Sequence, residues 1–295
     1  MTETPILEVR NLVQDFHINR KFTVKAVSGI TFTVGKGEVF GLVGETGSGK
    51  STVARSVIGV NRLTSGKIFF KGSEISDKAV YRQQKADLQK NMQIIFQDSA
   101  AALNPQMTVA QIIGEPLEIN RLCKTKEELD RIIYENLQQV GLSEIYRDKY
   151  PGELSGGQRQ RVAIARSIAI HPDLIIADEP IGSLDISIQA QIVTLFQELQ
   201  KKHRFSFIFI AHDLSIIRFI SDRIAVMLKG KIVEMADTQE LFENPLHPYT
   251  KSLISSVPVP DPRYERVKKI IEYDTSVFTG EGDFKEVSQG HYLLN

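Results

Sequence analysis

The chain has 295 residues, enough to bury one large core or a core with an appended segment. Its 36 basic residues balance its 36 acidic residues, so its formal net charge is zero. This balance argues against a basic surface for nucleic acid and against an acidic, disordered chain. The single cysteine, Cys123, excludes an internal disulfide and a metal site built from cysteines alone, as is typical of proteins from a reducing compartment.

No exported or membrane-spanning segment is predicted. Residues 1–10 include Glu3 and Glu8 and lack the apolar stretch of a signal peptide. Apolar runs such as 207–211 are far shorter than the roughly 20 residues that a membrane-spanning helix needs. Any association with a membrane is therefore expected to depend on a partner protein.

The first 60 residues predict an antiparallel β layer, followed by a strand, a loop and a helix. Residues 6–34 contain β-branched and aromatic runs, with alternation clearest at 30–34, before a break at Gly35-Lys36-Gly37. Val39–Val43 is a short apolar strand that leads into a glycine-rich turn, and residues 51–59 have helical composition.

Three later apolar runs predict a parallel sheet. They lie at residues 92–96, 174–177 and 205–210, and their apolar character is continuous rather than alternating. Continuous apolar runs of this length are typical of strands that are covered on both faces.

Charged, helix-forming stretches between residues 108 and 147 predict a helical subdomain, spanning about residues 98–165. One such stretch is 124–140, and we expect Pro116 and Gly141 to interrupt the helices. Further on, the prolines of residues 257–262 predict an extended linker into a polar tail.

The loop between the first predicted parallel strand and its helix matches the phosphate-loop pattern G-x-x-x-x-G-K-[ST]. Glycines let backbone N–H groups approach phosphate oxygens, Lys50 would neutralise the β and γ phosphates, and Ser51 offers a hydroxyl ligand for Mg²⁺. A glycine-rich connection with a chance lysine is the alternative. The residues assigned to nucleotide binding are Gly44, Glu45, Thr46, Gly47, Ser48, Gly49, Lys50, Ser51 and Thr52.

The loop alone does not separate kinases, GTPases, helicases and transporters, although no N-K-x-D segment supports a GTPase. Two carboxylates, Asp178 and Glu179, follow the apolar run 174–177, at the strand end where ligands bind in open α/β sheets. Asp178 suits Mg²⁺ coordination, and Glu179 suits polarisation of the attacking water. An isolated Asp-Glu pair would instead be interpreted as a charged strand end.

Residues 154–158 read Leu-Ser-Gly-Gly-Gln and lead into a predicted helix. This pentapeptide is the signature of the ABC ATPase family, which the chain resembles over about 250 residues. A helix N-terminus with glycines is a second anion site, and one chain does not easily fold both sites onto one phosphate. In the family, the signature closes over ATP held by the opposite subunit, so the resemblance assigns Ser155, Gly156, Gly157 and Gln158 to ATP of the partner.

The resemblance assigns further roles upstream. Phe16 is similar to the aromatic residue that stacks on adenine, with Phe22 as a rival and a plain β-core phenylalanine as the alternative. Gln97, which follows the run 92–96, is similar to the glutamine that senses Mg²⁺ and the attacking water. Its alternative is a surface-loop glutamine.

The resemblance also covers two elements downstream. Residues 183–185, with Asp185, resemble the loop that communicates across the dimer, and an N-cap for the following helix is a compatible alternative. His212 follows the run 205–210 and resembles the histidine that donates to the γ-phosphate. The other histidines are interpreted as surface residues (His17, His203, His291) or as loop residues before prolines (His171, His247).

Two longer segments resemble the oligopeptide and dipeptide permease branch, specifically its F-type ATPase subunits. One is residues 244–253 with the prolines of 258–262, and the other is residues 187–191 with Gln97-Asp98 and 103–105. Many members carry four C-terminal cysteines that bind an iron-sulfur cluster, whereas residues 267–295 contain none. We therefore expect no cluster.

The resemblance implies an α/β fold: a P-loop NTPase with an antiparallel β subdomain, a RecA-like parallel-sheet core and an inserted helical subdomain. Residues 1–256 would form the nucleotide-binding domain, and residues 257–295 a C-terminal extension. The chain would hydrolyse ATP to drive peptide import from the cytoplasmic face of the cell membrane. Its partners would be a paralogous D-type ATPase, two transmembrane permease subunits and, indirectly, an extracellular peptide-binding protein, without nucleic acid.

Two alternatives remain open. One is the ATPase of a related importer for nickel or another small solute. The other is a soluble ABC ATPase of DNA repair or ribosomes, but such proteins usually contain long coiled coils or two cassettes, and neither heptads nor a second phosphate loop is visible.

Overall fold

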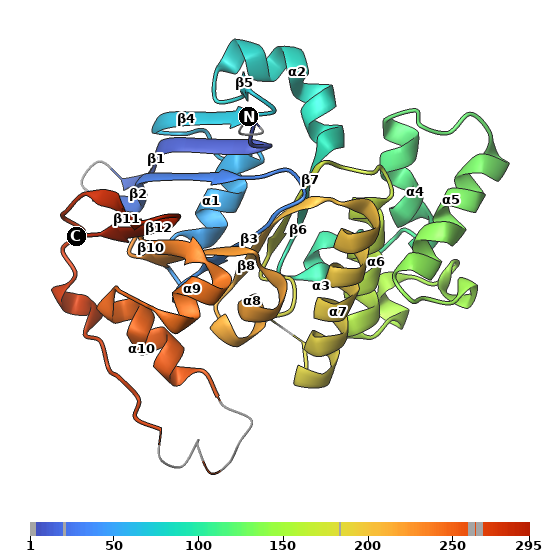
Figure 1. Ribbon diagram of the computed structural model, residues 1–295. Coiled ribbons are helices and arrows are strands. Elements are labelled where there is room, and N and C mark those ends of the chain that lie inside the picture. Colours follow the sequence, from blue (N-terminus) through green and yellow to red (C-terminus); the bar gives the residue numbers. More distant parts are fainter. Residues whose placement is uncertain (1–3, 20–21, 183, 259–262, 264–267) are drawn as a thin grey trace. The chain divides into compact units, whose positions relative to one another are not determined.

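The structure is a computed structural model that describes residues 4–19, 22–182, 184–258, 263 and 268–295. The chain forms two compact units (Figure 1). The first unit contains residues 1–77 and 208–295, and the second contains residues 78–207. Each unit is described by itself.

The first unit begins with the antiparallel layer that the sequence predicts. Its strand order is β2-β1-β4-β5, and β1 pairs antiparallel with both β2 and β4. Leu7 and Val9 of β1 are fully buried, in line with a strand that presents alternate residues to a core. The strands are β1 (Leu7–Asn19), β2 (Phe22–Val34), β4 (Ser65–Phe70) and β5 (Ser73–Glu74).

In the first unit, strands of a second, eight-stranded sheet follow one another in the order β11-β12-β10-β9-β3-β8. Strand β3 (Val39–Val43) is buried at all five residues and pairs in parallel with β9 (Arg223–Leu228), which explains its continuous apolar sequence. Strand β8 (Ser206–Ala211) spans the boundary between the units. The remaining elements before the C-terminal hairpin are α1 (Lys50–Val57), α8 (Leu214–Ile220), β10 (Lys231–Asp237), α9 (Thr238–Glu243) and α10 (Pro248–Ser256).

The C-terminal tail differs from the predicted polar tail. After the short 3₁₀ turn η3 (Thr275–Val277), strands β11 (Phe284–Ser288) and β12 (His291–Leu294) form a hairpin. Strand β12 pairs antiparallel with β10 and so extends the sheet (Figure 1). Leu294 and His291 are buried there. This short segment of mixed composition therefore forms a strand because it packs against the sheet, and not because its sequence has an apolar periodicity. Residues 259–262 of the predicted linker lie outside the described residues.

The second unit contains two parallel strands, β6 (Met92–Ile95) and β7 (Leu174–Asp178), as their apolar runs predict. Most of its other residues are helical, including those of the expected helical subdomain. These elements are α2 (Lys78–Asn91), α3 (Ser99–Ala102), α4 (Val109–Ile119), α5 (Lys126–Gln139), η1 (Glu144–Tyr146), η2 (Pro151–Glu153), α6 (Gly156–Ile168) and α7 (Ile186–His203).

Of the two expected helix breaks, one is correct and one is wrong. Gly141 follows the C-cap of α5 with a φ of 68°, a left-handed conformation that favours glycine and ends the helix. Pro116, in contrast, lies inside α4. That helix is held by a capping box at Thr108 and by buried residues such as Ile113, and it continues for only three residues beyond the proline.

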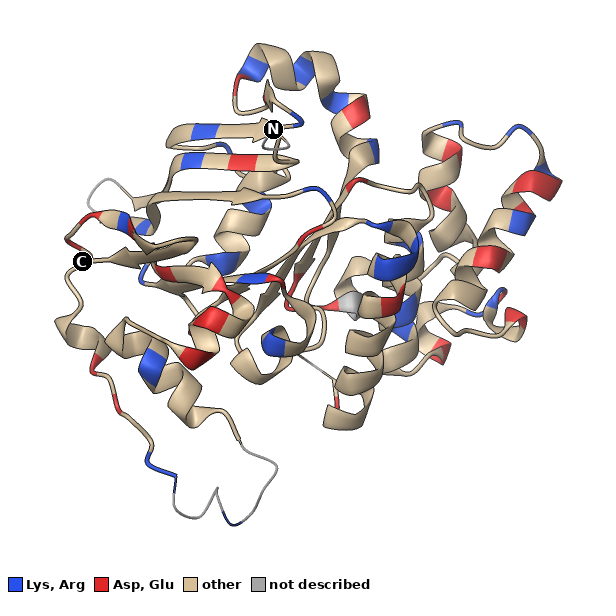
Figure 2. Ribbon diagram, viewed as in Figure 1, with Lys and Arg blue, Asp and Glu red and all other residues tan. Residues whose placement is uncertain are grey.

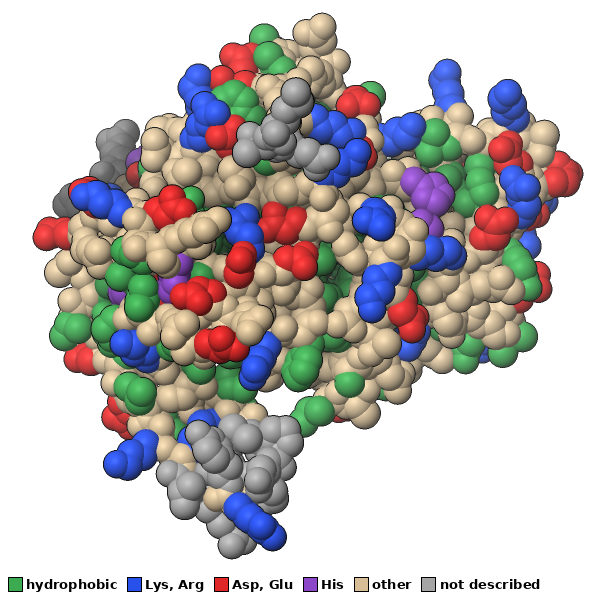
Figure 3. All heavy atoms as spheres, viewed as in Figure 1, with side chains coloured by type: hydrophobic (Ala, Val, Ile, Leu, Met, Phe, Trp, Pro, Cys, Tyr) green, Lys and Arg blue, Asp and Glu red, His purple; other side chains and the backbone are tan. Residues whose placement is uncertain are grey.

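Charged residues of both signs are distributed over the elements of both units (Figure 2). On the face drawn in Figure 3, basic and acidic side chains are interspersed. Among the described residues, no helix has the length and apolar character required to span a bilayer.

Candidate functional site

The phosphate loop follows β3 and has a backbone shape that requires glycine. Gly44 and Gly49 have φ values of 148° and 105°. A side-chain carbon on Gly44 would lie 2.2 Å from the carbonyl oxygen of Met227, and one on Gly49 would lie 2.3 Å from that of Ala26. Gly47 has a φ of 86° and faces open space within 4 Å. The loop is therefore packed against the strands at both ends and open at Gly47, as a phosphate cradle must be.

Lys50 is the first residue of α1, and its side chain folds back over the loop. It is buried, and its Nζ donates to the carbonyl oxygens of Gly44 (2.7 Å) and Glu45 (2.9 Å). The backbone N–H of Ser48 also donates to the Glu45 carbonyl, at 3.1 Å. Lys50 thus places a cation at the N-terminal end of a helix, next to the loop that would surround the phosphates.

Ser48 supplies an independent test of whether a phosphate fits the loop. Its side chain is buried, and its Oγ has no hydrogen-bond partner among the described residues. A buried hydroxyl without a partner is costly unless a ligand or water satisfies it. The residues present therefore fit a nucleotide phosphate.

The loop is also held by residues far away in the sequence. The N–H of Glu45 donates to the hydroxyl oxygen of Tyr249 in α10 at 3.1 Å, and the N–H of Gly230 donates to the carbonyl of Ser48 at 2.9 Å. Sequence reasoning missed both. The only signal for Tyr249 was its place in the segment 244–253 that resembles the peptide permeases, and this gave it no role at the loop.

In the second unit, Asp178 and Glu179 lie at the carboxyl end of β7, as predicted. Asp178 is buried as the last residue of the strand. Glu179 follows it with a φ of 48°, an uncommon conformation for a residue other than glycine. A side-chain carbon added to Gly182 would lie 3.6 Å from Glu179 Oε2 and 3.7 Å from Gln97 Nε2. The structure therefore brings the side chains of Glu179 and Gln97 to the same place, beside Gly182.

The signature segment begins α6. Ser155 is the N-cap, its Oγ accepts from the N–H of Gln158 at 3.3 Å, and Gln158 Oε1 accepts from the N–H of Ser155 at 2.9 Å. Gln158 Nε2 also donates to the Tyr146 hydroxyl at 2.9 Å. A side-chain carbon on Gly157 would lie 2.8 Å from Ile188 Cγ2, so this glycine lets α6 and α7 approach closely. Ser155 is exposed at a helix N-terminus, the geometry of an anion site.

The remaining predicted residues lie within a strand or next to the end of a strand or helix. Phe16 is half-buried in β1 opposite Val24, whereas its rival Phe22 is 57% exposed. His212 is exposed directly after β8. Asp185 is exposed at the N-cap position of α7 and makes no side-chain capping bond, and Ser183 lies outside the described residues.

The predicted site residues are divided between the two units. The first unit contains Lys50, Ser51 and His212. The second unit contains Gln97, Ser155, Asp178, Glu179 and Asp185.

His291 differs from its interpretation, and His247 does not. His291, expected on the surface, is buried in β12 with its Nε2 2.8 Å from Glu234 Oε1 and its Nδ1 3.2 Å from Glu240 Oε1. His247 lies in the connection before α10, as expected, and is buried there as the N-cap of the helix, where its Nδ1 accepts from the N–H of Tyr249 at 3.1 Å. A sequence pattern does not show these contacts, because the partners of His291 are more than 50 residues away.

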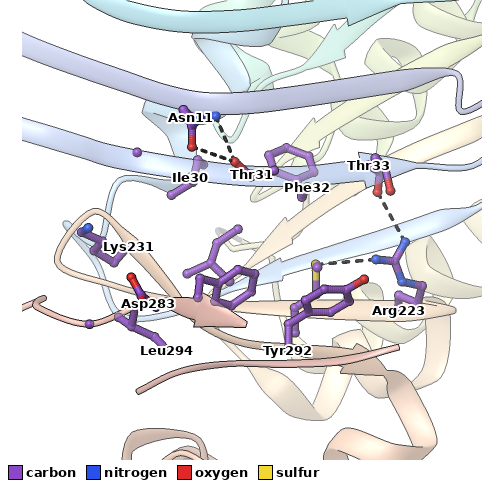
Figure 4. A pocket seen from close by; sticks show the side chains of 15 residues that line it. Asn11, Ile30, Thr31, Phe32, Thr33, Arg223, Lys231, Asp283, Tyr292 and Leu294 are labelled. Atoms are coloured by element: carbon purple, nitrogen blue, oxygen red, sulfur yellow. Dashed lines mark hydrogen bonds between the residues drawn. The ribbon is translucent and has the colours of Figure 1, made fainter. Parts of the chain in front are cut away.

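A separate cavity of ≈ 440 Å³ lies in the first unit between β2 and the C-terminal strands (Figure 4). Ile30 and Thr31 line it from β2, and Lys231, Tyr292 and Leu294 line it from β10 and β12. No residue of the phosphate loop lines it. The cavity is therefore not the predicted nucleotide site.

Two family models match the chain. The ABC transporter model matches residues 27–182, and the model of the oligopeptide/dipeptide transporter C-terminal region matches residues 233–279. The first match includes the phosphate loop, the signature and Glu179, and the second includes Tyr249.

Curated relatives and solved structures agree with these matches. The chain is 50% identical to the oligopeptide transport ATP-binding protein OppF of Bacillus subtilis, covering 100% of this chain and 97% of that protein. It is 47% identical to AmiF of Streptococcus pneumoniae over 98% of this chain and 94% of that protein. It is 43% identical to the dipeptide transport ATP-binding protein DppF of Lactococcus lactis over 100% of this chain and 96% of that protein.

Among solved structures, cbiO1 from Clostridium perfringens has a TM-score of 0.72 at 27% identity, covering 90% of this chain and 99% of that one. The ATP-binding cassette MJ0796, a dimer bound to ADP and Pi, has a TM-score of 0.69 at 26% identity, covering 79% of this chain and 98% of that one. The chain therefore belongs to the ABC transporter family as an ATP-hydrolysing subunit.

Proposed function

We propose that this chain hydrolyses ATP to power the import of oligopeptides or dipeptides. The observation that carries the proposal is the combination, in one chain, of the phosphate loop with the segment 233–279 that matches peptide transporters. The full-length relatives named for oligopeptide or dipeptide transport support it. The alternative solute, nickel, has no corresponding support among these relatives.

The geometry of the two units supports a division of the chemistry. In the first unit, the phosphate loop and Lys50 bind the β and γ phosphates, while Ser51 offers a hydroxyl to Mg²⁺. In the second unit, Asp178 contributes a carboxylate to Mg²⁺, and Glu179, next to Gln97, polarises the attacking water. Mg²⁺, when bound, neutralises charge on the phosphate oxygens. His212 donates to the γ-phosphate, and Phe16 stacks on the adenine.

We propose that ATP is bound at composite sites between two ATPase subunits. Ser155 and the N-terminus of α6 are exposed, as is Asp185, so these groups are accessible to another molecule. In this arrangement Lys50 and Ser155 of one chain serve different ATP molecules. The partner is a non-identical D-type paralogue, joined to two transmembrane permease subunits at the cytoplasmic face of the membrane, with an extracellular peptide-binding protein acting indirectly.

A mixed dimer tests the composite site. Lys50→Ala on both chains removes both phosphate cradles, and Ser155→Arg on both chains blocks both signatures, so each pure dimer should fail to close. In a dimer with one mutation on each chain, both mutated residues belong to the same composite site. The other site keeps a normal Lys50 and a normal Ser155. We expect ATP-dependent closure to return in the mixed dimer, measured by cross-linking of cysteines placed across the interface. No closure in dimers verified as mixed would contradict shared sites.

Uptake by cells tests the transported solute. Cells without this chain should lose accumulation of a labelled tripeptide and keep accumulation of nickel, and the intact gene, but not a Glu179→Gln copy, should restore peptide uptake. Loss of nickel uptake with normal peptide uptake would favour the other importer.

We also propose that residues 1–256 form the nucleotide-binding domain, with the helical subdomain at about 98–165, and that the extension 257–295 holds no iron-sulfur cluster. A cluster needs several cysteine ligands, and the chain has only Cys123. Protein purified without oxygen should contain no acid-labile sulfide. Stoichiometric iron and sulfide would refute this proposal.

A further inference from the structure

The two peptide groups on either side of Glu45 in the phosphate loop are each fixed by hydrogen bonds. The carbonyl oxygen of Glu45 accepts from Lys50 Nζ at 2.9 Å and from the N–H of Ser48 at 3.1 Å. On the other side of the residue, its N–H donates to the Tyr249 hydroxyl at 3.1 Å. A rotation of either peptide group of Glu45 would therefore break at least one of these bonds. The orientation of the loop depends on a hydroxyl that lies 204 residues away in the sequence.

Tyr249 is itself held firmly. Its side chain is 1% exposed, and its ring lies 5.8 Å from that of Tyr273, centroid to centroid. Its own N–H donates to His247 Nδ1, so the helix that presents the hydroxyl begins at a fixed cap. The ring of His247 lies 5.9 Å from Tyr273 and 6.2 Å from Phe278. Tyr249 thus belongs to an aromatic cluster formed by α10 and the segment after it.

A buried carboxylate connects this cluster to the end of the chain. Glu234 in β10 is 0% exposed, and its Oε2 accepts from the N–H of His247 at 3.0 Å. Its Oε1 accepts from the N–H of Leu246 at 2.7 Å and lies 2.8 Å from Nε2 of His291 in β12. Hydrogen bonds therefore run from β12 through Glu234 and His247 to Tyr249, and from Tyr249 to the phosphate loop. All of these residues belong to the first unit.

We propose that Tyr249 is a positioning residue for ATP: its hydroxyl accepts from the Glu45 N–H and so holds the Gly44–Glu45 peptide group in the orientation that keeps the phosphate loop ready to bind. Described residues of the C-terminal part of the chain, in α10, β12 and the segment 268–278, thereby contribute to nucleotide affinity without touching the nucleotide. This inference rests on ATP binding by the loop and does not depend on which solute is transported. Its physical basis is pre-organisation, because a loop that is already ordered loses less conformational entropy when it binds its ligand.

Two tyrosine-to-phenylalanine variants of the full-length chain test the inference. Tyr249→Phe keeps the ring and removes the oxygen that accepts from Glu45. Tyr273→Phe is the matched control, because it removes the same atom from the same aromatic cluster, whereas the hydroxyl that bonds Glu45 is that of Tyr249. Equilibrium binding of ATP and Mg²⁺ is measured first for the unchanged chain, so that a failure of nucleotide binding itself is recognised separately.

We expect Tyr249→Phe to raise the Kd for ATP about 3- to 10-fold, since one buried hydrogen bond is lost. Tyr273→Phe should stay within about twofold of the unchanged chain. In the assembled transporter, Tyr249→Phe should raise KM for ATP in the same proportion and leave kcat within about twofold, because saturating ATP restores the loop. A purely structural role would lower the Tm and leave the Kd unchanged. An unchanged Kd in Tyr249→Phe, or an equal rise in both variants, would overturn the inference.

Discussion

The two units present their candidate ATP groups in different ways. In the first unit, Lys50 and Ser48 are buried, and the loop is held by hydrogen bonds with Gly230, in the turn between β9 and β10, and with Tyr249 in α10. In the second unit, Gln97, Ser155 and Asp185 are exposed next to the ends of strands or helices, and Glu179 is half-buried. The phosphate loop is therefore a pre-ordered cradle, fixed by hydrogen bonds and open at Gly47, whereas most of the groups proposed for turnover and for the partner lie on accessible segments. Binding and turnover should be separable by mutation.

The largest separation is expected at Glu179. Glu179→Gln keeps the phosphate cradle and removes the group that polarises water, so ATP hydrolysis should fall about 10²- to 10⁴-fold. ATP affinity should stay within about threefold, because no residue of the first unit changes. Steady-state ATPase rates of the transporter and equilibrium binding measure the two quantities. Glu198→Gln, an exposed carboxylate on α7, is the control, and a near-normal rate in Glu179→Gln would remove its assignment.

The opposite separation is expected at Lys50. Lys50→Ala removes the cation that would face the phosphates and also the bonds to the carbonyls of Gly44 and Glu45. A charge-assisted bond of this kind contributes about 1.5–3 kcal/mol, so the Kd for ATP should rise about 10- to 100-fold. Titration calorimetry measures the change, with the exposed Lys36→Ala as control. ATP affinity unchanged by Lys50→Ala would contradict the cradle.

A smaller effect concerns the pH dependence of stability in the first unit. Burial raises the pKa of the Tyr249 hydroxyl to about 12, against an ordinary value of 10.0. Between these values the unfolded chain loses this proton while the folded chain keeps it, so the free energy of unfolding falls as pH rises from 10 towards 12. By pH 11 this residue alone should cost about 1.4 kcal/mol.

Tyr249→Phe has no proton to lose and should lack this part of the alkaline decline. Thermal unfolding of both proteins at pH 8 and pH 11 measures it. Equal declines in the two proteins would show that the hydroxyl is not buried as described.

The smallest effect is expected at His247. Burial lowers the pKa of its imidazole, and the nearby carboxylate of Glu234 opposes this shift. The unfolded chain therefore takes up the proton first as pH falls below about 6.5, and the folded state loses stability there. Protonation also removes the lone pair of Nδ1 that caps Tyr249. His247→Asn keeps an acceptor at the cap and does not titrate, so its Tm should fall less between pH 7 and pH 5.5 than that of the unchanged chain. A parallel fall in both would contradict the shift.

Much of the site was predictable because its residues are contiguous. The phosphate loop, the carboxylates after β7 and the signature before α6 each lie at a junction between a strand or helix and a turn, and residue types at fixed spacing identify such junctions. The apolar strands could also be predicted from the sequence, since a parallel strand covered on both faces must be apolar throughout. The helix α5 lies within the stretch 124–140 that composition predicted. Helix α4, in contrast, passes through Pro116, because buried neighbours and a capping box outweigh one missing N–H.

The sequence by itself determined the ATP-binding motifs, the order of the strands along the chain and the family resemblance. Only the tertiary structure decided which distant residues support the site. Tyr249 and Glu45 are 204 residues apart, and His291 and Glu234 are 57 residues apart. Neither pair leaves a periodic or local pattern, because a hydrogen bond between distant segments depends on how the intervening sheet and helices pack. The hairpin of β11 and β12 could not be predicted for the same reason. Its mixed composition resembles that of a polar tail, and it forms strands because β12 pairs with the edge of β10.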